Sequence, residues 1–333
     1  MLNNDSKDFK DLASARPVST LATTFQPTAW GLFNKVWASI IGNPADRFDF
    51  VPSQTPVSTL TETFSLIVLY YAIVLGGREW MRDRKPYRLN GLFMAHNLIL
   101  TVISGSLLTL FAGELVPTLW QDGLYENICG ASGWTRPLVT LYYVVELFDH
   151  VELIDTVFLF LKKKRLTFLH CYHHPATALL CFNQLVGHTS VSWVPITLNL
   201  FVHVVMYWYY FQSARGVKIW WKEWITRLPI AQFVVDLGFI YFASWDYFAS
   251  TYYPSLPHVG TCAGEPFAAI TGCLILSSYL VLFIGFYLTT YKKAGMQRHV
   301  RAAAIGIGKS EVSTVPETVD KLEEAVPELL NRS

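Results

Sequence analysis

The chain has 333 residues, of which 52% are hydrophobic, 15% aromatic and only 15% charged. This composition is too apolar for an ordinary soluble enzyme and indicates a membrane protein. The formal net charge of +1, from 26 Lys and Arg against 25 Asp and Glu, gives no electrostatic basis for a nucleic-acid partner, and none is expected.

Residues 1–56 precede the first long apolar stretch and are predicted to form an N-terminal segment of their own. Five large apolar residues in it fall on one helical face: Trp30, Phe33, Trp37, Ile40 and Ile41. Such a face suits either a helix lying in the membrane interface or an amphipathic helix buried against the protein. The sequence does not separate these two interpretations.

Seven long apolar stretches follow within residues 57–291, each near the roughly 20 residues that a spanning helix needs. They cover residues 57–77, 89–113, 137–161, 166–188, 191–211, 228–245 and 267–291. The predicted fold is an all-α polytopic membrane protein with seven transmembrane helices. Because seven is odd, the two termini are expected on opposite sides of the membrane.

Basic residues concentrate in alternate connections. The connections after the first, third, fifth and seventh stretches carry clusters of Lys and Arg, whereas the three opposite loops together hold only Arg136. By the positive-inside rule the basic connections are cytosolic and the N-terminus is lumenal or external. Residues 292–333, first basic and then acidic, are predicted to form a cytosolic tail, to which no fold is assigned.

The chain has five cysteines. Cys129 and Cys262 fall in the two longer lumenal loops, whereas the other three, Cys171, Cys181 and Cys273, fall inside apolar stretches. An oxidising lumen favours a disulfide between Cys129 and Cys262, and two free thiols are the alternative.

The third stretch contains four acids that recur every third residue: Glu146, Asp149, Glu152 and Asp155. This spacing drifts by about 60° per step, which keeps neighbouring acids within one broad stripe facing the bundle interior. Ionisable groups in a membrane commonly cost a few kcal/mol each, so they indicate a functional site by default. Interhelical hydrogen bonding is the alternative, and it is favoured for Glu146.

The fourth stretch opens with three histidines, His170, His173 and His174. On a helix they span an arc of about 100°, so all three can line one cavity. A single intramembrane histidine is usually a packing residue, but three on one face opposite a carboxylate-bearing helix indicate chemistry.

One stripe of the fifth stretch mixes polar and aromatic residues: Asn199, His203, Met206, Tyr207 and Tyr210. Asp155, His173 and His203 each lie about 10–12 Å of helix from the nearest basic connection. This common depth predicts one polar chamber in the cytosolic half of the membrane, continuous with an apolar tunnel. A ligand with an anionic head and a long apolar tail would fit both parts.

These residues form three motifs that resemble those of the very-long-chain fatty acid elongase (ELO) family, especially its fungal members. The motifs are His170-x-x-His173-His174, Glu152-x-x-Asp155-Thr156 and Asn199-x-x-x-His203-x-x-Met206-Tyr207-x-Tyr209-Tyr210. The resemblance covers all seven stretches, and the order of the motifs on consecutive helices is highly specific. Two positions depart from the family: Asp149 replaces a lysine, and Pro229 replaces the first glutamine of the Thr226-x-x-Gln-x-x-Gln232 motif.

The resemblance implies a very-long-chain 3-oxoacyl-CoA synthase of the endoplasmic reticulum membrane. Such an enzyme condenses long-chain acyl-CoA with malonyl-CoA to 3-oxoacyl-CoA, CO2 and CoA, in very-long-chain fatty acid and sphingolipid synthesis. The implied partners are membrane lipid and the 3-ketoacyl reductase, dehydratase and enoyl reductase of the elongation cycle. No cofactor and no metal are expected.

By the same resemblance the acyl group passes onto an imidazole, and by position this is His173. A neutral imidazole is a competent nucleophile near pH 7. We expect Asp155 or Glu152 to orient the histidines. Three further histidines are candidates for stabilising the oxyanion and handling protons: His170, His174 and His203.

Seven residues are candidates for holding CoA. Four would hold its arm, Asn199, Tyr207, Tyr210 and Gln232, and three would meet its phosphates, Lys218, Lys222 and Lys292. For the lysines, ordinary positive-inside topology is an equally good explanation. Four bulky residues near the end of the sixth stretch are candidates for the tunnel floor, with packing as the alternative: Phe239, Tyr241, Phe242 and Trp245.

Two other classes of protein compete with this interpretation. Clustered histidines also suit a non-haem-iron desaturase or hydroxylase, but such enzymes have several histidine boxes and this chain has one. A seven-helix receptor or transporter would explain the topology, but it leaves the histidines opposite paired acids unexplained.

Overall fold

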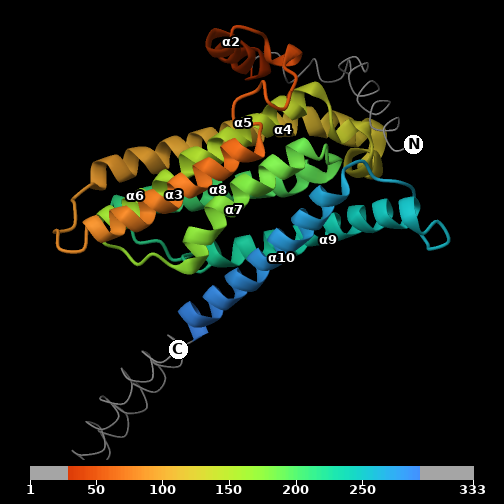
Figure 1. The fold of residues 1–333 in the computed structure, drawn as a ribbon. Coiled ribbons are helices and arrows are strands. Elements are labelled where there is room, and N and C mark those ends of the chain that lie inside the picture. The colour runs from red at the N-terminus through yellow and green to blue at the C-terminus, as the bar shows by residue number, and fades with distance from the viewer. Residues whose placement is uncertain (1–28, 293–333) are drawn as a thin grey trace, which may run out of the picture. The chain divides into compact units, whose positions relative to one another are not determined.

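The computed structural model describes residues 29–292, and in that range every regular element is a helix (Figure 1). The longer helices are α2 (Ala29–Ile41), α3 (Leu60–Trp80), α4 (Asn90–Cys129), α5 (Arg136–Glu152), α6 (Ile154–Leu161), α7 (Phe168–Val186), α8 (Trp193–Ala214), α9 (Trp224–Tyr252) and α10 (Pro266–Tyr287). Short helical turns are η2 (Ala45–Arg47), η3 (Ala131–Gly133), η4 (Ser190–Ser192) and η5 (Leu288–Lys292). The start of the N-terminal segment and nearly all of the predicted tail lie outside the described residues.

Five helical segments of the described range are long and apolar enough to cross a membrane: Leu60–Trp80, Asn90–Cys129, Ser190–Ala214, Trp224–Tyr252 and Pro266–Tyr291. The third and fourth predicted stretches are helical as well, but their helices are not both long enough and apolar enough to be counted with these five. The third is divided at Leu153, which leaves α5 only 17 residues long, and the fourth, α7, carries the three histidines. The chain is therefore a helical multi-pass membrane protein, with five spans identified by length and composition.

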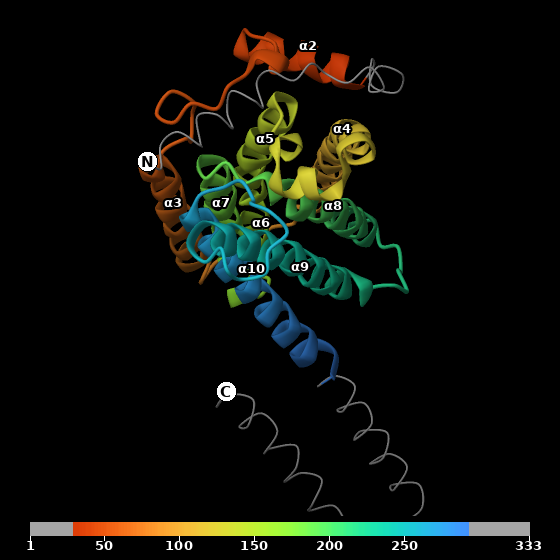
Figure 2. The same ribbon diagram turned by 90° about the vertical axis from the view of Figure 1, so that its right-hand side faces the viewer.

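The two helices that carry the acids and the histidines are packed inside the bundle. Figure 2 shows α5 and α7 between α3 and α8. Buried side chains occur on all sides of α5, including Leu138 and Leu141, which are both 0% exposed. A helix that is buried all round does not face lipid, so its polar groups can be satisfied by neighbouring helices.

Helix α4 continues well beyond the predicted end of the second stretch at residue 113 and is kinked at Gly123. Gly123 has φ 79° and ψ 173°, a conformation that L-residues rarely adopt. Asn127 stabilises the kink, because its side chain accepts from Thr118 at 2.7 Å and donates to the Gly123 carbonyl at 2.8 Å. The kink turns the end of α4 so that Cys129 reaches the loop between α9 and α10.

A disulfide joins Cys129 to Cys262 at this end of the bundle, which we call the disulfide end. Ala263 N donates to the Cys129 carbonyl at 2.8 Å. Asp246 of α9 also ties the region together, accepting from Tyr125 Oη at 3.0 Å and from Val259 N at 3.1 Å. These bonds hold the α9–α10 loop against the end of α4.

We expect loss of this disulfide to lower stability substantially. The bridge closes a loop across a sequence separation of 133 residues, and removal of a native disulfide typically costs about 2–5 kcal/mol. Cys129→Ser should lower the apparent Tm in detergent, while Cys273→Ser, which removes a free cysteine, should leave it nearly unchanged. Equal Tm values for the two variants would show that the bridge contributes little.

Helix α2 packs on the bundle with its aromatic residues. Trp37 is 7% exposed, and its ring lies 5.2 Å from that of Phe48 and 6.4 Å from that of Tyr143. The packed interpretation therefore holds for this part of the predicted face. Trp30 and Phe33 also pack against the core, whereas Ile40 and Ile41 are 74% and 49% exposed.

Candidate functional site

The break between α5 and α6 sets the positions of two acids. Helix α5 ends at Glu152 and α6 begins at Ile154, and across the break Thr156 N bonds to the Leu153 carbonyl at 3.2 Å. Glu152 and Asp155 thus lie on either side of Leu153. Each of them binds a different set of partners.

Glu152 forms a buried pair with His203 of α8. Its Oε1 lies 2.8 Å from His203 Nδ1, and its other carboxylate oxygen lies 4.0 Å from His174 Nδ1. Glu152 and His203 are only 2% and 5% exposed. Because an unpaired buried charge is costly, each partner depends on the other.

Asp155 binds two groups from other helices. Its Oδ1 lies 2.7 Å from Nε2 of His96 on α4, and its Oδ2 accepts from the Tyr207 hydroxyl at 2.8 Å. The adjacent Thr156 contacts the histidine motif, with Oγ1 3.1 Å from His170 Nε2. The acidic motif therefore reaches α4, α7 and α8.

The histidine motif begins in the first turn of α7, at its third residue. The Thr167 side chain accepts from His170 N and caps the helix. The rings meet edge to face, with centroids 4.7 Å apart for His170 and His174 and 5.4 Å apart for His173 and His174. The three imidazoles therefore lie close together, but they do not all line one cavity, because His170 and His174 do not line the cavity that His173 lines.

Pro175 directly follows the histidines and leaves one helix carbonyl without its usual donor. Proline has no N–H to give to the carbonyl four residues earlier, which is that of Cys171. The Tyr71 hydroxyl of α3 donates to this oxygen at 3.3 Å. A side chain from another helix thus replaces the lost bond at the level of the histidines.

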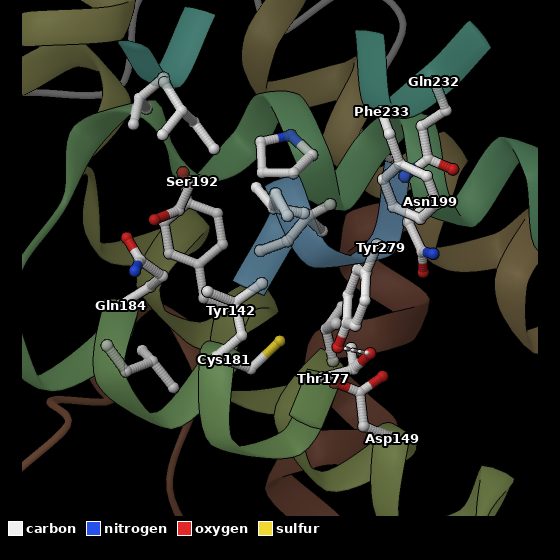
Figure 3. A pocket seen from close by; sticks show the side chains of 18 of the residues that line it. Tyr142, Asp149, Thr177, Cys181, Gln184, Ser192, Asn199, Gln232, Phe233 and Tyr279 are labelled. Carbon is white, nitrogen blue, oxygen red and sulfur yellow. Dashed lines mark hydrogen bonds between the residues drawn. The ribbon is translucent and has the colours of Figure 1, made fainter. Parts of the chain in front are cut away.

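A cavity extends from His173 toward the disulfide end, and the space in it that is not filled by atoms is about 760 Å³, including any part that is open to solvent. We call it the main cavity (Figure 3). Asn199, Gln232 and Phe233 lie at the end marked by Tyr279, and Gln184 and Ser192 lie at the far end. We call the first end the His173 end, because the Tyr279 ring contacts that of His173. Most of the wall between the ends is apolar. Of the four predicted histidines, His173 is the one that lines this cavity.

His173 is held from the α10 side. Its ring centroid lies 4.7 Å from that of Tyr279, and the Tyr279 hydroxyl donates to the His173 carbonyl at 3.1 Å. The same hydroxyl lies 3.0 Å from Thr177 Oγ1. Tyr279 and Thr177 also line the cavity, and sequence inspection did not select either of them.

The residues predicted to hold CoA do not lie together. Asn199 and Gln232 line the main cavity, and Tyr207 is engaged by Asp155. Tyr210 is at the surface, with its ring 5.5 Å from that of Tyr209. Lys218 and Lys222 are exposed in the α8–α9 connection, while the side chain of Lys292 lies outside what the structure describes.

The two positions that depart from the family motifs both lie within helices. Asp149 is 4% exposed, lines the main cavity, and its Oδ2 has no hydrogen-bond partner among the described residues. Pro229 is buried within α9, and the helix continues through it to Gln232. Gln232 Nε2 donates to Asp236 at 3.1 Å.

The four residues proposed as the tunnel floor do not line the main cavity. Phe239 and Phe242 line a separate open hollow between α9 and the end of α4. Tyr241 and Trp245 are 52% and 50% exposed. The prediction was wrong because their position near the end of α9 fixed the depth of these residues but not the side of the helix to which they point.

His96 belongs to the site because it contacts Asp155, although it lies outside the three sequence motifs. It follows Arg88 by eight residues, or about 12 Å of helix, which is the depth shared by Asp155, His173 and His203. The same depth measurement would therefore have selected it.

We expect His96 to act as a positioning residue for Asp155. His96→Leu removes the partner of Asp155 Oδ1. It should lower kcat of the reaction that is proposed below about tenfold, with little change in KM. His96→Gln, which can still donate a hydrogen bond, should recover most of the loss. Equal kcat for His96→Leu and the unaltered protein would remove His96 from the site.

Acids and histidines can also bind metals, so the donor geometry matters. In the described part of the chain, one set of three or more His, Cys, Asp or Glu ligand atoms lies within 4.8 Å of one another, and it consists of Cys129, Asp246 and Cys262. Two of these sulfurs form the disulfide. Ring nitrogens of His96, His170 and His203 instead contact two carboxylates and a hydroxyl.

The fold and the site define a class of protein: a multi-pass helical membrane protein with a buried histidine–carboxylate centre at one end of a long apolar cavity. Residues 55–299 match the GNS1/SUR4 (ELO) family, so the chain belongs to this family of fatty acid elongases. It is therefore an enzyme of fatty acid elongation.

Individual relatives agree with this assignment. The chain is 50% identical to the Schizosaccharomyces pombe protein named "Putative fatty acid elongase 1" over 286 residues, which cover 86% of this chain and 85% of the relative. It is 35% identical to fatty acid elongase A of Dictyostelium discoideum, over 74% of this chain and 89% of the relative. It is 32% identical to very long chain fatty acid elongase 2 of Rattus norvegicus, over 73% and 84% respectively.

Proposed function

We propose that this elongase is the condensing enzyme of the cycle, a very-long-chain 3-oxoacyl-CoA synthase. It joins a long-chain acyl-CoA to malonyl-CoA and releases CO2 and CoA. The observation that carries the proposal is the position of His173, a histidine lining one end of a long apolar cavity and backed by a buried histidine–carboxylate network. A cavity of this form suits a reactive thioester at one end and a hydrocarbon chain along its length.

In the first half-reaction, an imidazole nitrogen of His173 attacks the thioester carbonyl. The bond from that carbon to sulfur breaks, CoA leaves as the thiolate, and the acyl group is held on the imidazole. An acyl-imidazole remains activated enough to transfer its acyl group onward. The cavity shields this intermediate from water, because most of its wall is apolar.

In the second half-reaction, malonyl-CoA loses CO2, and the resulting enolate carbon attacks the acyl carbonyl. The bond from that carbonyl to the imidazole breaks and 3-oxoacyl-CoA is released. The amides of Asn199 and Gln232 line the His173 end of the cavity, where they can donate to the thioester or to the developing oxyanion. No cofactor takes part in this scheme.

The other histidines support His173 in this proposal. The Glu152–His203 pair is placed beside His174, so it can hold a proton and fix the orientation of the neighbouring imidazole. His170 is held by Thr156. Lys218, Lys222 and Lys292 remain candidates for the phosphates of CoA, and Tyr207 and Tyr210 for its arm.

Topology and location belong to the same proposal. We take α5 with α6, and α7, as two further crossings, which gives seven transmembrane helices between a lumenal N-terminal segment (residues 1–56) and a cytosolic tail (residues 292–333). Helix α7 has 19 residues, or about 28 Å, close to the thickness of the hydrocarbon core. The membrane is that of the endoplasmic reticulum, and the product would pass to a 3-ketoacyl reductase, a dehydratase and an enoyl reductase.

The test uses the purified full chain in lipid vesicles with long-chain acyl-CoA and labelled malonyl-CoA, without NADPH. Label should appear in 3-oxoacyl-CoA, with one CO2 and one CoA released per product, and a chelator should have no effect. Binding of acyl-CoA without consumption of malonyl-CoA would contradict the proposal and favour a transporter or receptor. Activity that a chelator abolishes and iron restores would favour a desaturase or hydroxylase.

A further inference from the structure

A hollow lined by cations lies between the end of α3 and the connection from α6 to α7. The space in it that is not filled by atoms is about 1530 Å³, including the part that is open to solvent. Five of its lining side chains are exposed and basic: Arg78, Arg82, Lys163, Lys164 and Arg165. We call this site the basic hollow. Helix α7 runs from it to the disulfide end, where Glu265 N donates to the Gly187 carbonyl at 3.0 Å.

Little negative charge offsets the cations of the basic hollow. Glu79 is the one acid among the residues that line it, and Glu79 pairs with Arg82. Within the described part of the chain, Arg78, Lys164 and Arg165 form no ion pair. The hollow therefore has a positive potential, which suits a ligand with phosphate oxygens.

An apolar face of α3 leads away from the basic hollow. Leu75 lines the hollow, and Val68 and Phe64 follow it on the same side of the helix, seven and eleven residues earlier. All three side chains are at least 50% exposed, and α3 is long and apolar enough to cross a membrane. This face is therefore open to the hydrocarbon chains of the lipid.

Aromatic residues mark the level of the basic hollow. Trp80, the last residue of α3, is 50% exposed, and its ring lies nearly parallel to that of Tyr87 at 6.5 Å. Exposed Trp and Tyr at the end of a span are typical of the membrane–water interface. The cations of the hollow are thus at the level of the lipid headgroups.

The basic hollow is separate from the main cavity. The two spaces share no lining residue, and no residue of α3 lines the main cavity. Helix α3 packs against α6 and α7 and lies at the edge of the bundle in Figure 2. A ligand of the hollow therefore arrives from the bilayer or its surface and does not pass through the cavity that His173 lines.

We propose that the basic hollow binds one anionic phospholipid of the membrane. Arg78, Lys164 and Arg165 hold the phosphate of its headgroup, and its acyl chains lie along the apolar face of α3 that begins at Leu75. Basic pockets between helices at the cytosolic surface are typical sites for anionic headgroups. The site takes no part in the proposed reaction and does not depend on it.

The bound lipid stabilises the packing of α3 beside the histidine motif. The cations of the hollow come from α3, the residues just after it and the α6–α7 connection, so one phosphate joins these parts. From α3, Tyr71 donates to the Cys171 carbonyl at 3.3 Å, and Tyr70 Oη lies 3.0 Å from Thr156 Oγ1. Because a ligand that binds the folded state stabilises it, an occupied hollow should raise the apparent Tm.

The test adds phosphatidic acid to the delipidated full chain in detergent, with phosphatidylcholine as the zwitterionic comparison. Native mass spectrometry counts the lipids bound per chain, and a thermal melt gives the apparent Tm. One phosphatidic acid should bind per chain at saturation, at least about tenfold more tightly than phosphatidylcholine, and it should raise the Tm by a few degrees. Equal affinity for the two lipids would overturn the proposal.

Two double variants separate the basic hollow from net charge. Arg78→Gln with Arg165→Gln removes two cations of the hollow and should weaken binding of phosphatidic acid at least about tenfold. Lys85→Gln with Arg88→Gln is the matched control, because it removes the same charge from the α3–α4 connection outside the hollow. The control should bind within twofold of the unaltered protein. If the first variant does not fold, Lys164→Glu reverses one exposed charge of the hollow and should also weaken binding.

Inorganic phosphate and CoA distinguish a lipid from other phosphate ligands. Inorganic phosphate should displace phosphatidic acid only in large excess, because it makes no contact with the apolar face of α3. Leu75→Ser should accordingly weaken binding of phosphatidic acid and leave that of phosphate unchanged. Displacement by equimolar inorganic phosphate, or by equimolar CoA, would assign the hollow to a soluble phosphate ligand and overturn the lipid site.

The variants give the remaining decisive outcomes. Unchanged binding in a folded variant that lacks Arg78 and Arg165 would overturn the proposal. Equal weakening in the matched control would show that the net charge of the surface attracts the lipid and would overturn it as well. Weak binding confined to the variants of the hollow, with the Tm increase lost in parallel, is the result that the proposal requires.

Discussion

His173→Ala should abolish condensation while the protein remains folded. The substitution removes the imidazole that lines the main cavity, and loss of a nucleophile typically lowers kcat by at least about 1,000-fold. His173→Gln should be as inactive, since an amide does not form an acyl intermediate of comparable reactivity. Release of labelled CO2 and 3-oxoacyl-CoA from malonyl-CoA measures the loss.

The matched control is His258→Ala, because His258 is an exposed histidine in the α9–α10 loop. Its activity should stay within twofold of that of the unaltered protein, since surface substitutions rarely have larger effects. Both variants should keep the same Tm in detergent within a few degrees. Substantial condensation by a folded His173→Ala protein would remove His173 from the role of nucleophile.

Glu152→Ala should cause the second large effect, on stability as well as on activity. It leaves His203, which is 5% exposed, without the carboxylate that lies 2.8 Å away. Breaking a buried pair by removing one partner typically costs about 3–5 kcal/mol. The apparent Tm should fall by several degrees, and condensation should fall at least about 100-fold.

Glu152→Gln separates the two contributions. The amide keeps the size of the side chain and can still bond to His203, so most of the stability should return, whereas activity should remain low because the charge is lost. Glu79→Gln is the control at an exposed acid paired with Arg82, and it should change stability by less than about 1 kcal/mol. Full activity of Glu152→Gln would limit Glu152 to a structural role.

Helix periodicity predicts which residues of one helix share a face, but it does not predict which side chains of different helices meet. The rings of His170, His173 and His174 lie close together on α7, because the spacing of residues along a helix fixes the face on which each residue lies. The contact of Glu152 with His203 joins two helices and depends on their packing. The apolar stretches also predicted the helices. A run of about 20 apolar residues that crosses a membrane forms a helix, because its backbone N–H and C=O groups must bond to each other in the absence of water.

The remaining features depend on how the helices are rotated and packed, which periodicity does not specify. Helix α4 extends past Glu114 to Cys129, although the predicted apolar stretch ends at residue 113, just before the charge of Glu114. The selection of His173 over His174 as the cavity residue also depends on packing against Tyr279. The far wall at Gln184 involves residues of α7, α9 and α10, so no single stretch of sequence indicates it.

The most direct test of the central claim is the mass of the intact protein after incubation with long-chain acyl-CoA alone, without malonyl-CoA. The account predicts release of one CoA per active chain and an increase in mass equal to one acyl group, mapped by fragmentation to His173. The adduct should disappear, with formation of 3-oxoacyl-CoA, when malonyl-CoA is added, and it should be absent from His173→Ala. Rapid condensation by a protein that releases no CoA and carries no acyl group before malonyl-CoA is added would contradict the acyl-imidazole mechanism.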